Sequence, residues 1–522
     1  MSKRPNNEAG ATPPPFARSA VLTYGTQVSA AFLSLLSVLI VARALGAEGR
    51  GNVAFLTAIT FLTANLATFG LQEANANFAA SEPRVRRALA SNSVLLSLVL
   101  GGAAIAALSA LIALVPAVAG ESDPTLRWMA FAFIPAILLQ IYLRFLVQAD
   151  YGFAVTNTAY LLAPALNVVG NGLFYAFGIL SVGTAVGWWL AGQTLETVLL
   201  AWYVQRRLAG FGRPDLALAR RALAFGARAH PGRIMLLGNY RLDQWLLGAI
   251  AGSRELGVYS VAVAWAEALW YLPTALSYVQ RPDLVRAARD EAARLAARVF
   301  RAVILITALF GVVMFAAAPI LCTVIFGDEF RDSVGMLRIL IVASLGVTTI
   351  KLLGSALVAR GSPGLQSLAI GTGFVCSVVL DIVLIPPFGG TGAAVAAALA
   401  HTAAGLVIAT IFIRTLGARA SDLVPHRGDL AWFVRRLRKR FGAGGRIAAP
   451  PPDPDAGPAD SHPDPVRDVE DHESRQHARQ QTPFLSGHAD GAHAEDEGTG
   501  EVDDELEREQ DARGPAESGE RE

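Results

Sequence analysis

Residues 299–323 read VFRAVILITALFGVVMFAAAPILCT, an apolar run whose one charged side chain, Arg301, lies near its start. A bilayer core of about 30 Å needs about 20 apolar residues of helix per crossing, so this run can span a membrane. Backbone groups find no water in hydrocarbon, which leaves helices and closed barrels as spanning structures. A barrel strand would alternate apolar and polar residues, so the run predicts a transmembrane helix.

Similar runs recur through most of the chain. The predicted spans are 20–42, 53–74, 91–117, 126–147, 153–179, 183–204, 233–250, 257–279, 299–323, 335–358, 364–386 and 390–413. The 522 residues are 53% hydrophobic and only 17% charged, which is too apolar for a soluble globular protein. We therefore predict an all-α polytopic membrane protein with about 12 transmembrane helices.

Arginines in the gaps, and at the ends of the spans next to them, concentrate in alternate gaps. The rich gaps hold Arg84, Arg86, Arg87, Arg206, Arg207, Arg213, Arg220, Arg221, Arg228, Arg233, Arg281, Arg286, Arg289, Arg294, Arg298, Arg301 and Arg360, and the poor gaps hold Arg43, Arg50, Arg127, Arg254, Arg331 and Arg338. The positive-inside rule places the rich gaps in the cytoplasm, and an even number of spans places both termini there. The poor gaps are predicted to face outward.

One sequence pattern recurs in the two halves of the predicted membrane region. Leu45-Gly46-Ala47-Glu48-Gly49-Arg50-Gly51-Asn52-Val53-Ala54 follows the first span, and Ala251-Gly252-Ser253-Arg254-Glu255-Leu256-Gly257-Val258-Tyr259-Ser260 follows the seventh. A second echo links 182–186, entering the sixth span, with 391–395, entering the twelfth. Such self-similarity predicts two six-helix bundles of the same orientation, related by an axis along the membrane normal and facing each other across a cleft.

The expected division of the chain follows from these spans. It consists of a cytoplasmic N-terminus at 1–19, an N-terminal bundle at 20–204, a cytoplasmic linker at 205–232, a C-terminal bundle at 233–414, a basic amphipathic juxtamembrane segment at 415–449 and a disordered acidic tail at 450–522. Within the juxtamembrane segment, apolar Leu430, Trp432, Phe433 and Leu437 oppose Arg435, Arg436, Arg438, Lys439 and Arg440. This pattern predicts an interfacial helix on anionic inner-leaflet lipid.

The sequence contains no pattern typical of an enzyme. It has no nucleophile elbow, phosphate-binding glycine loop, HExxH or CxxC motif, and the outward gaps are too short for a catalytic domain. Cys322 and Cys376 fall in or beside apolar spans and have no metal-site spacing. We expect no metal, no cofactor and no nucleic-acid partner.

The informative residues are therefore ionisable side chains at membrane depth, which are costly unless they face a cavity or a partner. Arg241 and Asp243 lie near mid-span at 233–250, two residues apart, and so do not share a helical face. Glu267 lies near the middle of the next span, and a structural pair between Arg241 and Glu267 is the main alternative to a functional role. Further candidates are Arg144, Lys351 and Asp381, for which snorkelling or capping is the alternative, with Glu196 and His401 also at mid-span.

These motifs resemble those of bacterial polysaccharide and oligosaccharide flippases, within the multidrug/oligosaccharidyl-lipid/polysaccharide exporter superfamily. The likeness covers about 18–415. It rests on 42–51, on Arg241-Leu242-Asp243-Gln244-Trp245 with the later Gly257-Val258-Tyr259-Ser260, and on 380–386 before Gly392-Ala393-Ala394.

The resemblance implies a two-lobed, V-shaped transporter in the bacterial plasma membrane. It would move an undecaprenyl-pyrophosphate-linked oligosaccharide from the inner to the outer leaflet for cell-surface polysaccharide biosynthesis. Arg241, Arg144 and Lys351 are then candidates for binding the anion. Asp243, Glu267 and Asp381 are candidates for coupling to a proton or sodium gradient. Expected partners are membrane lipids, a polysaccharide polymerase and glycosyltransferases.

Other functions stay open from the sequence. A multidrug antiporter would favour an acidic, aromatic-lined cavity, and a lipid II flippase would usually add two C-terminal helices. An integral-membrane polymerase or ligase would carry a long outward loop with catalytic residues. A scaffold for envelope assembly would depend on 450–522 rather than on charges in the cleft.

Overall fold

The structure is a computed structural model that describes residues 16–208, 210–426 and 428–442. Helices are the only regular secondary structure within these ranges, which agrees with the predicted all-α class. The predicted acidic tail at 450–522 lies outside the described residues, as does most of the predicted N-terminal segment at 1–19.

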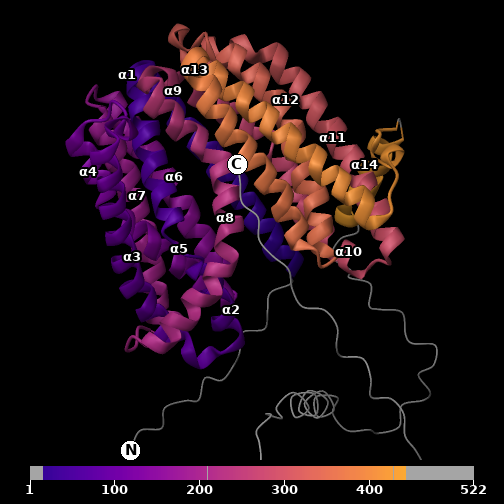
Figure 1. Cartoon of the computed structure of the whole chain (residues 1–522), viewed down its shortest axis with the longest axis horizontal. Coiled ribbons are helices and arrows are strands. Elements are labelled where there is room, and N and C mark those ends of the chain that lie inside the picture. The colour runs from indigo at the N-terminus through magenta and orange to yellow at the C-terminus, as the bar shows by residue number, and fades with distance from the viewer. Residues whose placement is uncertain (1–15, 209, 427, 443–522) are drawn as a thin grey trace, which may run out of the picture. The chain divides into compact units, whose positions relative to one another are not determined.

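The first half of the chain forms seven α-helices within the described residues (Figure 1). They are α1 (Phe16–Leu66), α2 (Leu71–Ser81), α3 (Arg86–Leu114), α4 (Pro124–Phe131), α5 (Ile134–Ala149), α6 (Phe153–Ala176) and α7 (Val182–Tyr203), with short turns η1 (Pro83–Val85), η2 (Pro116–Ala119) and η3 (Val204–Leu208). Hydrogen bonds to side chains define where two of these helices begin. The side chain of Asp123 accepts from the Leu126 N–H at α4, and Ser181 and Thr184 form a capping box at α7.

The second half begins with α8 (Leu216–Ile250), which starts earlier than its predicted span. The other elements are α9 (Gly252–Ala268), α10 (Tyr271–Arg286), α11 (Arg289–Pro319), η4 (Ile320–Val324), η5 (Asp328–Phe330), α12 (Ser333–Ala359), α13 (Pro363–Leu416), η6 (Ala420–Leu423) and α14 (Asp429–Gly442). Asp215 caps α8 by accepting from the Leu218 N–H, so residues 216–232, expected in the linking loop, are helical.

Two of the helices, α1 and α13, each contain two predicted spans joined across a kink. The kinks lie at Gly46, with φ +68°, and Gly389, with φ +53°, a region that side chains with a Cβ avoid. A carboxylate accepts a hydrogen bond at each corner: Glu329 from the Ala47 N–H and Glu255 from the Gly390 N–H, both at 2.9 Å. Each corner is therefore fixed by a carboxylate from a distant part of the chain.

Seven helical segments of the described residues are long and apolar enough to cross a membrane. The segments containing α1 and α13 supply two crossings each, and α7, α8 and the interrupted pair α9–α10 supply the other three, giving the twelve predicted crossings. The helices α7, α8 and α9–α10 carry more polar residues than the other crossings, and several of these polar residues line the cavity described below. The chain is a multi-pass membrane protein with the predicted helical fold.

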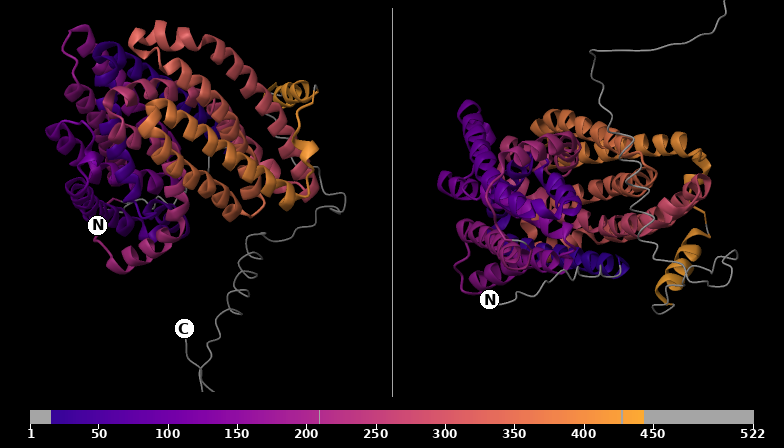
Figure 2. Two further views of the ribbon diagram at one scale, coloured as in Figure 1. Left: turned by 45° about the horizontal axis from the view of Figure 1, so that its top comes forward. Right: turned by 90° about the horizontal axis from the view of Figure 1, so that it is seen from below.

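The crossings form two bundles that meet along α1, α8 and α9 (Figure 1). Two further views show α11, α12 and α13 side by side in one bundle, with α3 to α7 in the other (Figure 2). Each bundle has its own apolar core, and a third core is shared between them. Phe55, Leu247 and Tyr259 belong to this shared core and are almost fully buried.

The juxtamembrane helix α14 packs on α11, so one side of it is covered by protein. Phe433 is buried there, and Trp432 stacks beside the Arg298 guanidinium. The sequence grouped both aromatic residues with Leu430 on one lipid-facing side. That grouping was wrong, because the aromatic residues contact α11 while Leu430 is exposed.

Candidate functional site

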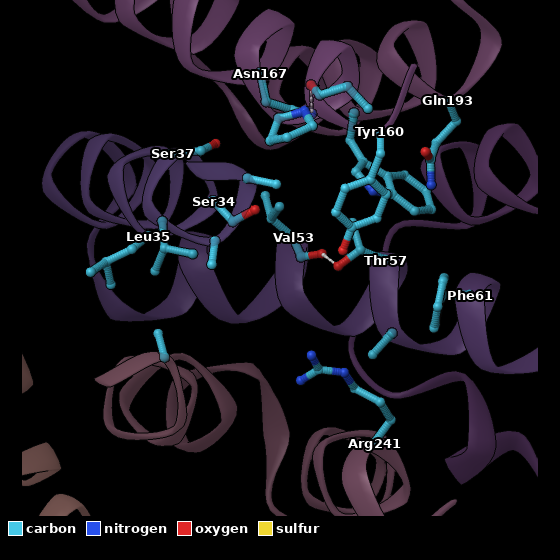
Figure 3. Close-up of a pocket in the computed structure, with 18 of the residues that line it drawn as sticks. Ser34, Leu35, Ser37, Val53, Thr57, Phe61, Tyr160, Asn167, Gln193 and Arg241 are labelled. Atoms are coloured by element: carbon cyan, nitrogen blue, oxygen red, sulfur yellow. Dashed lines mark hydrogen bonds between the residues drawn. The ribbon is translucent and has the colours of Figure 1, made fainter. Parts of the chain in front are cut away.

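A cavity of about 600 Å³ lies between the two bundles. The N-terminal bundle lines it with α1, α5, α6 and α7, and the C-terminal bundle with α8, α9 and α10. In Figure 3, Arg241 points from α8 into this space, towards the helix that carries Thr57 and Phe61, while Tyr160 and Asn167 face it from the opposite side. The predicted cleft between the bundles is therefore present as a cavity whose wall combines apolar side chains with polar and charged ones.

The charges that line the cavity are unequal. Four arginines and two glutamates lie on its wall, so their formal sum is 4 − 2 = +2. The arginines are Arg50, Arg144, Arg233 and Arg241, and the glutamates are Glu196 and Glu267. An anionic group entering this space would be attracted, and a cationic one would be repelled.

Both glutamates are paired with an arginine across helices. Arg241 donates to the Glu267 carboxylate at 2.7 and 3.4 Å, which is the interhelical pair that the sequence left open as an alternative. Arg144 forms an ion pair with Glu196, whose side chain is only 2% exposed, and its guanidinium lies 5.2 Å from the Tyr160 ring. Each pair keeps one face in the cavity, so both remain available to a ligand.

Two cavity arginines were not among the predicted site residues. Arg50 was assigned to an outward gap and Arg233 to the edge of an arginine-rich cytoplasmic gap, but the structure places both on the cavity wall. Among the described residues, the Nε atom of each is buried without a hydrogen-bond partner. Arg233 has only long contacts, at 3.4 Å to the Asn65 amide oxygen and 3.9 Å to the Glu73 carboxylate. Arg50 lies close enough to Arg241 for the two charges to repel.

Neutral polar groups complete the wall. They are Ser34, Ser37, Thr57, Asn65, Gln140, Asn167, Asn171, Gln193, Gln244 and Ser260. Asn171 donates to Ser37 at 3.2 Å and Gln140 to Gln193 at 3.3 Å, so several of these groups already bridge neighbouring helices. Their remaining hydrogen-bonding capacity, with the rings of Trp189 and Tyr271, suits a hydroxyl-rich ligand.

Three predicted site residues lie outside this cavity, deeper in the C-terminal bundle. Asp243 lines a second cavity of about 20 Å³, room for about one water, and accepts from the Tyr259 hydroxyl at 2.5 Å. Asp381 is fully buried, accepts from Ser377 at 3.0 Å, and has one carboxylate oxygen without a hydrogen-bond partner among the described residues. Lys351 lies 5.6 Å from the centre of the Tyr240 ring.

Two groups of charged residues therefore lie on different sides of α8. Arg241 faces the large cavity and Asp243 the small one, as expected for residues two apart on a helix. Asp243 and Asp381 are close enough for their charges to interact. Of the six predicted site residues, Arg144, Arg241 and Glu267 thus line the large cavity, Asp243 and Asp381 form a buried carboxylate group, and Lys351 lies beside Tyr240.

The family is shown by a comparison of sequences. A family model described as "Polysaccharide biosynthesis protein" matches residues 40–335, which is more than half of the 522 residues. The chain belongs to this polysaccharide biosynthesis protein family. The match runs from α1 to the first turn of α12 and includes every arginine on the cavity wall. A search of curated protein sequences finds no significant match.

Solved structures show the same fold at low sequence identity. The lipid II flippase MurJ, in an inward closed conformation, aligns with a TM-score of 0.63 at 13% identity, covering 81% of this chain and 93% of that one. An inward-facing multidrug resistance MATE family transporter of the MOP superfamily aligns with a TM-score of 0.60 at 15% identity, covering 76% and 98%. A MOP superfamily transporter from Pyrococcus furiosus gives 0.51 at 14% identity, covering 77% and 95%.

Family and fold together describe a polysaccharide biosynthesis protein that has the fold of MATE transporters and of MurJ. At these identities the solved structures establish the fold alone. The substrate has to be argued from the cavity.

Proposed function

We propose that this family member flips an undecaprenyl-pyrophosphate-linked oligosaccharide from the inner to the outer leaflet of the bacterial plasma membrane. The product would serve cell-surface polysaccharide biosynthesis, with glycosyltransferases acting before the flippase and a polymerase after it. The observation that carries the proposal is the net positive cavity between the two bundles, where Arg50, Arg144 and Arg233 each have a buried Nε atom without a hydrogen-bond partner among the described residues. Both termini would be cytoplasmic, as the arginine-rich gaps predict.

A pyrophosphate cannot cross hydrocarbon unaided, because an unpaired charge loses most of its solvation there. Guanidinium groups replace that solvation best, since their fork of N–H donors matches phosphate oxygens. Arg50 and Arg233 have donors to spare, and Arg241 and Arg144 can share theirs between a glutamate and a ligand. These four side chains would bind the pyrophosphate, and the polar wall would contact the sugars.

The buried carboxylates suit a different task. Asp243 and Asp381 lie together in the C-terminal bundle, so holding both ionised is costly unless a cation or proton joins them. Occupancy that differed between two conformations would couple a proton or sodium gradient to alternating access. Glu267, on the wall of the large cavity, and Lys351, beside the Tyr240 ring, would take part through Arg241 and Tyr240.

The test is where the lipid-linked oligosaccharide accumulates. In a strain lacking this protein, it should build up on the cytoplasmic leaflet, and wild-type protein should restore exposure on the outer leaflet. A variant with Arg50→Gln and Arg233→Gln should fail to restore it although it reaches the membrane in normal amounts. Normal outer-leaflet exposure in the deletion strain would count decisively against the proposal.

Two transporters of the same fold would give other results. A multidrug antiporter should export organic cations, for which a cavity of charge +2 is unfavourable. A lipid II flippase should be needed for peptidoglycan synthesis, so its loss would stop growth rather than remove a surface polysaccharide.

A further inference from the structure

The helix α14 has one face fixed to the C-terminal bundle. Arg301 on α11 holds the Asp429 carboxylate in a two-point contact, at 2.7 and 3.0 Å, and Arg436 pairs with Asp283 on α10 at 2.8 Å. Trp432 lies between the guanidiniums of Arg298 and Arg436, at 4.7 and 5.4 Å from its ring. The orientation of α14 about its own axis is thereby determined.

Another face of α14 has no partner among the described residues. Leu430 and Val434, one helical turn apart, are 42% and 41% exposed. In the sequence, Leu437 and Phe441 continue the same helical spacing. Arg435, next to Val434 in the sequence, is also exposed. The result is a narrow apolar stripe with a cation beside it.

The surroundings of α14 are basic as well. Exposed arginines on α10 and α11 are Arg281, Arg286, Arg289, Arg294 and Arg298, against exposed Asp290 and Glu291. Arg289 at the start of α11 donates to the Thr415 carbonyl at the end of α13, so two membrane crossings end here. The stripe therefore lies near the ends of two membrane-spanning helices. This is the depth at which lipid headgroups are found.

We propose that the exposed stripe of α14 binds an anionic membrane surface, with Leu430 and Val434 inserted among the lipid chains and Arg435 at the phosphates. Charge complementarity and the position at the ends of α11 and α13 favour lipid over an acidic protein. The pairs to Asp429 and Asp283 would then transmit this attachment to the C-terminal bundle. The inference does not depend on what the cavity carries.

The experiment uses the full-length protein in lipid nanodiscs. With Cys322→Ala and Cys376→Ala, which remove the two native cysteines, Val434→Cys is labelled with an environment-sensitive dye. Discs of phosphatidylcholine alone are compared with discs containing phosphatidylglycerol, and brominated lipid is added as a quencher. Ala431→Cys, exposed on the same helix but off the stripe, is the matched control.

We expect a blue-shifted, quenchable signal from position 434 in anionic discs, and a smaller shift from position 431. Arg435→Gln should weaken the anionic-lipid effect about fivefold, since one surface cation contributes about 1 kcal/mol near such a membrane. An identical, unquenched spectrum in both lipids would overturn the proposal. Shielding in native membranes but not in anionic discs would also overturn it, in favour of a protein partner.

Discussion

Gly51 and Gly257 pack backbone against backbone where the two bundles meet. A Cβ on Gly51 would lie 1.6 Å from the Ser253 carbonyl oxygen, and one on Gly257 would lie 1.8 Å from the Ala47 carbonyl oxygen. The two contacts are equivalent, because 253 − 47 and 257 − 51 both equal 206. The repeated sequence of the two halves thus meets itself across a local two-fold axis, as in a symmetric dimer interface.

Alanine at either glycine should force α1 and α9 apart. We expect Gly51→Ala or Gly257→Ala to cost about 1–3 kcal/mol or more through overpacking, seen as a lower thermal unfolding midpoint in detergent. Gly102→Ala is the control, because nothing lies within 4 Å of the added methyl group. Equal midpoints for all three variants would show that the close contact does not constrain the bundles.

Substitution of Arg50 should weaken transport without lowering stability, whereas substitution of Arg144 should lower stability. Arg50→Gln breaks no ion pair among the described residues and removes a charge that Arg241 repels, so stability should not fall. Transport should nevertheless fall, with the apparent affinity for lipid-linked substrate at least about tenfold weaker after loss of a charged hydrogen bond. Reconstituted flipping measured beside thermal unfolding separates the two effects.

Arg144→Ala should instead destabilise the protein by about 3–5 kcal/mol, because it leaves the buried Glu196 charge without its partner. Adding Glu196→Gln should recover most of that loss. If the double variant is no more stable than Arg144→Ala alone, the pair is not the source of the effect.

We expect the carboxylates assigned to coupling to determine how transport depends on an ion gradient, and not which substrate is bound. Asp243→Asn and Glu267→Gln should each reduce the dependence of flipping on an imposed proton or sodium gradient, measured in proteoliposomes. Substrate binding without a gradient should be retained by Asp243→Asn, since Asp243 lies outside the large cavity. Unchanged flipping rate and unchanged gradient dependence in both variants would remove these residues from the coupling proposal.

The contact of α14 with α11 should stabilise the protein at neutral pH and lose this effect at low pH. The hydrogen-bonded Arg301 guanidinium holds the pKa of Asp429 below its ordinary value of 3.8. Because the folded-state pKa is lowered, the stabilising contribution is complete above that ordinary value and is lost as pH falls through the lowered one. Arg301→Gln should therefore lower the unfolding midpoint at pH 7, with the difference from wild type shrinking below pH 3.8. Arg294→Gln, an exposed change on the same helix, should have little effect at either pH.

The sequence predicted the helices better than it predicted their faces. Run length alone identifies a crossing, so the twelve spans and the corners near Gly46 and Gly389 could be anticipated. The direction in which each side chain points could not be predicted, because helices such as α7 and α8 show no clear amphipathic face. Arg50 and Arg233 were missed because Arg50 lies in the gap between two predicted spans and Arg233 is the first residue of another, so each resembles an ordinary loop cation.

The path of α8 from one bundle to the other has a mechanical consequence. Gly226 packs against Gly70 of the N-terminal bundle, and Gly238 packs against Phe374 of the C-terminal bundle. Between them lies Pro231, which removes one N–H from the hydrogen-bond ladder. If the two bundles rock against each other, α8 must bend, and bending costs the least free energy at Pro231, where a backbone hydrogen bond of the helix is already missing. Pro231 is thus the natural hinge, a few residues from the arginines that would bind the cargo.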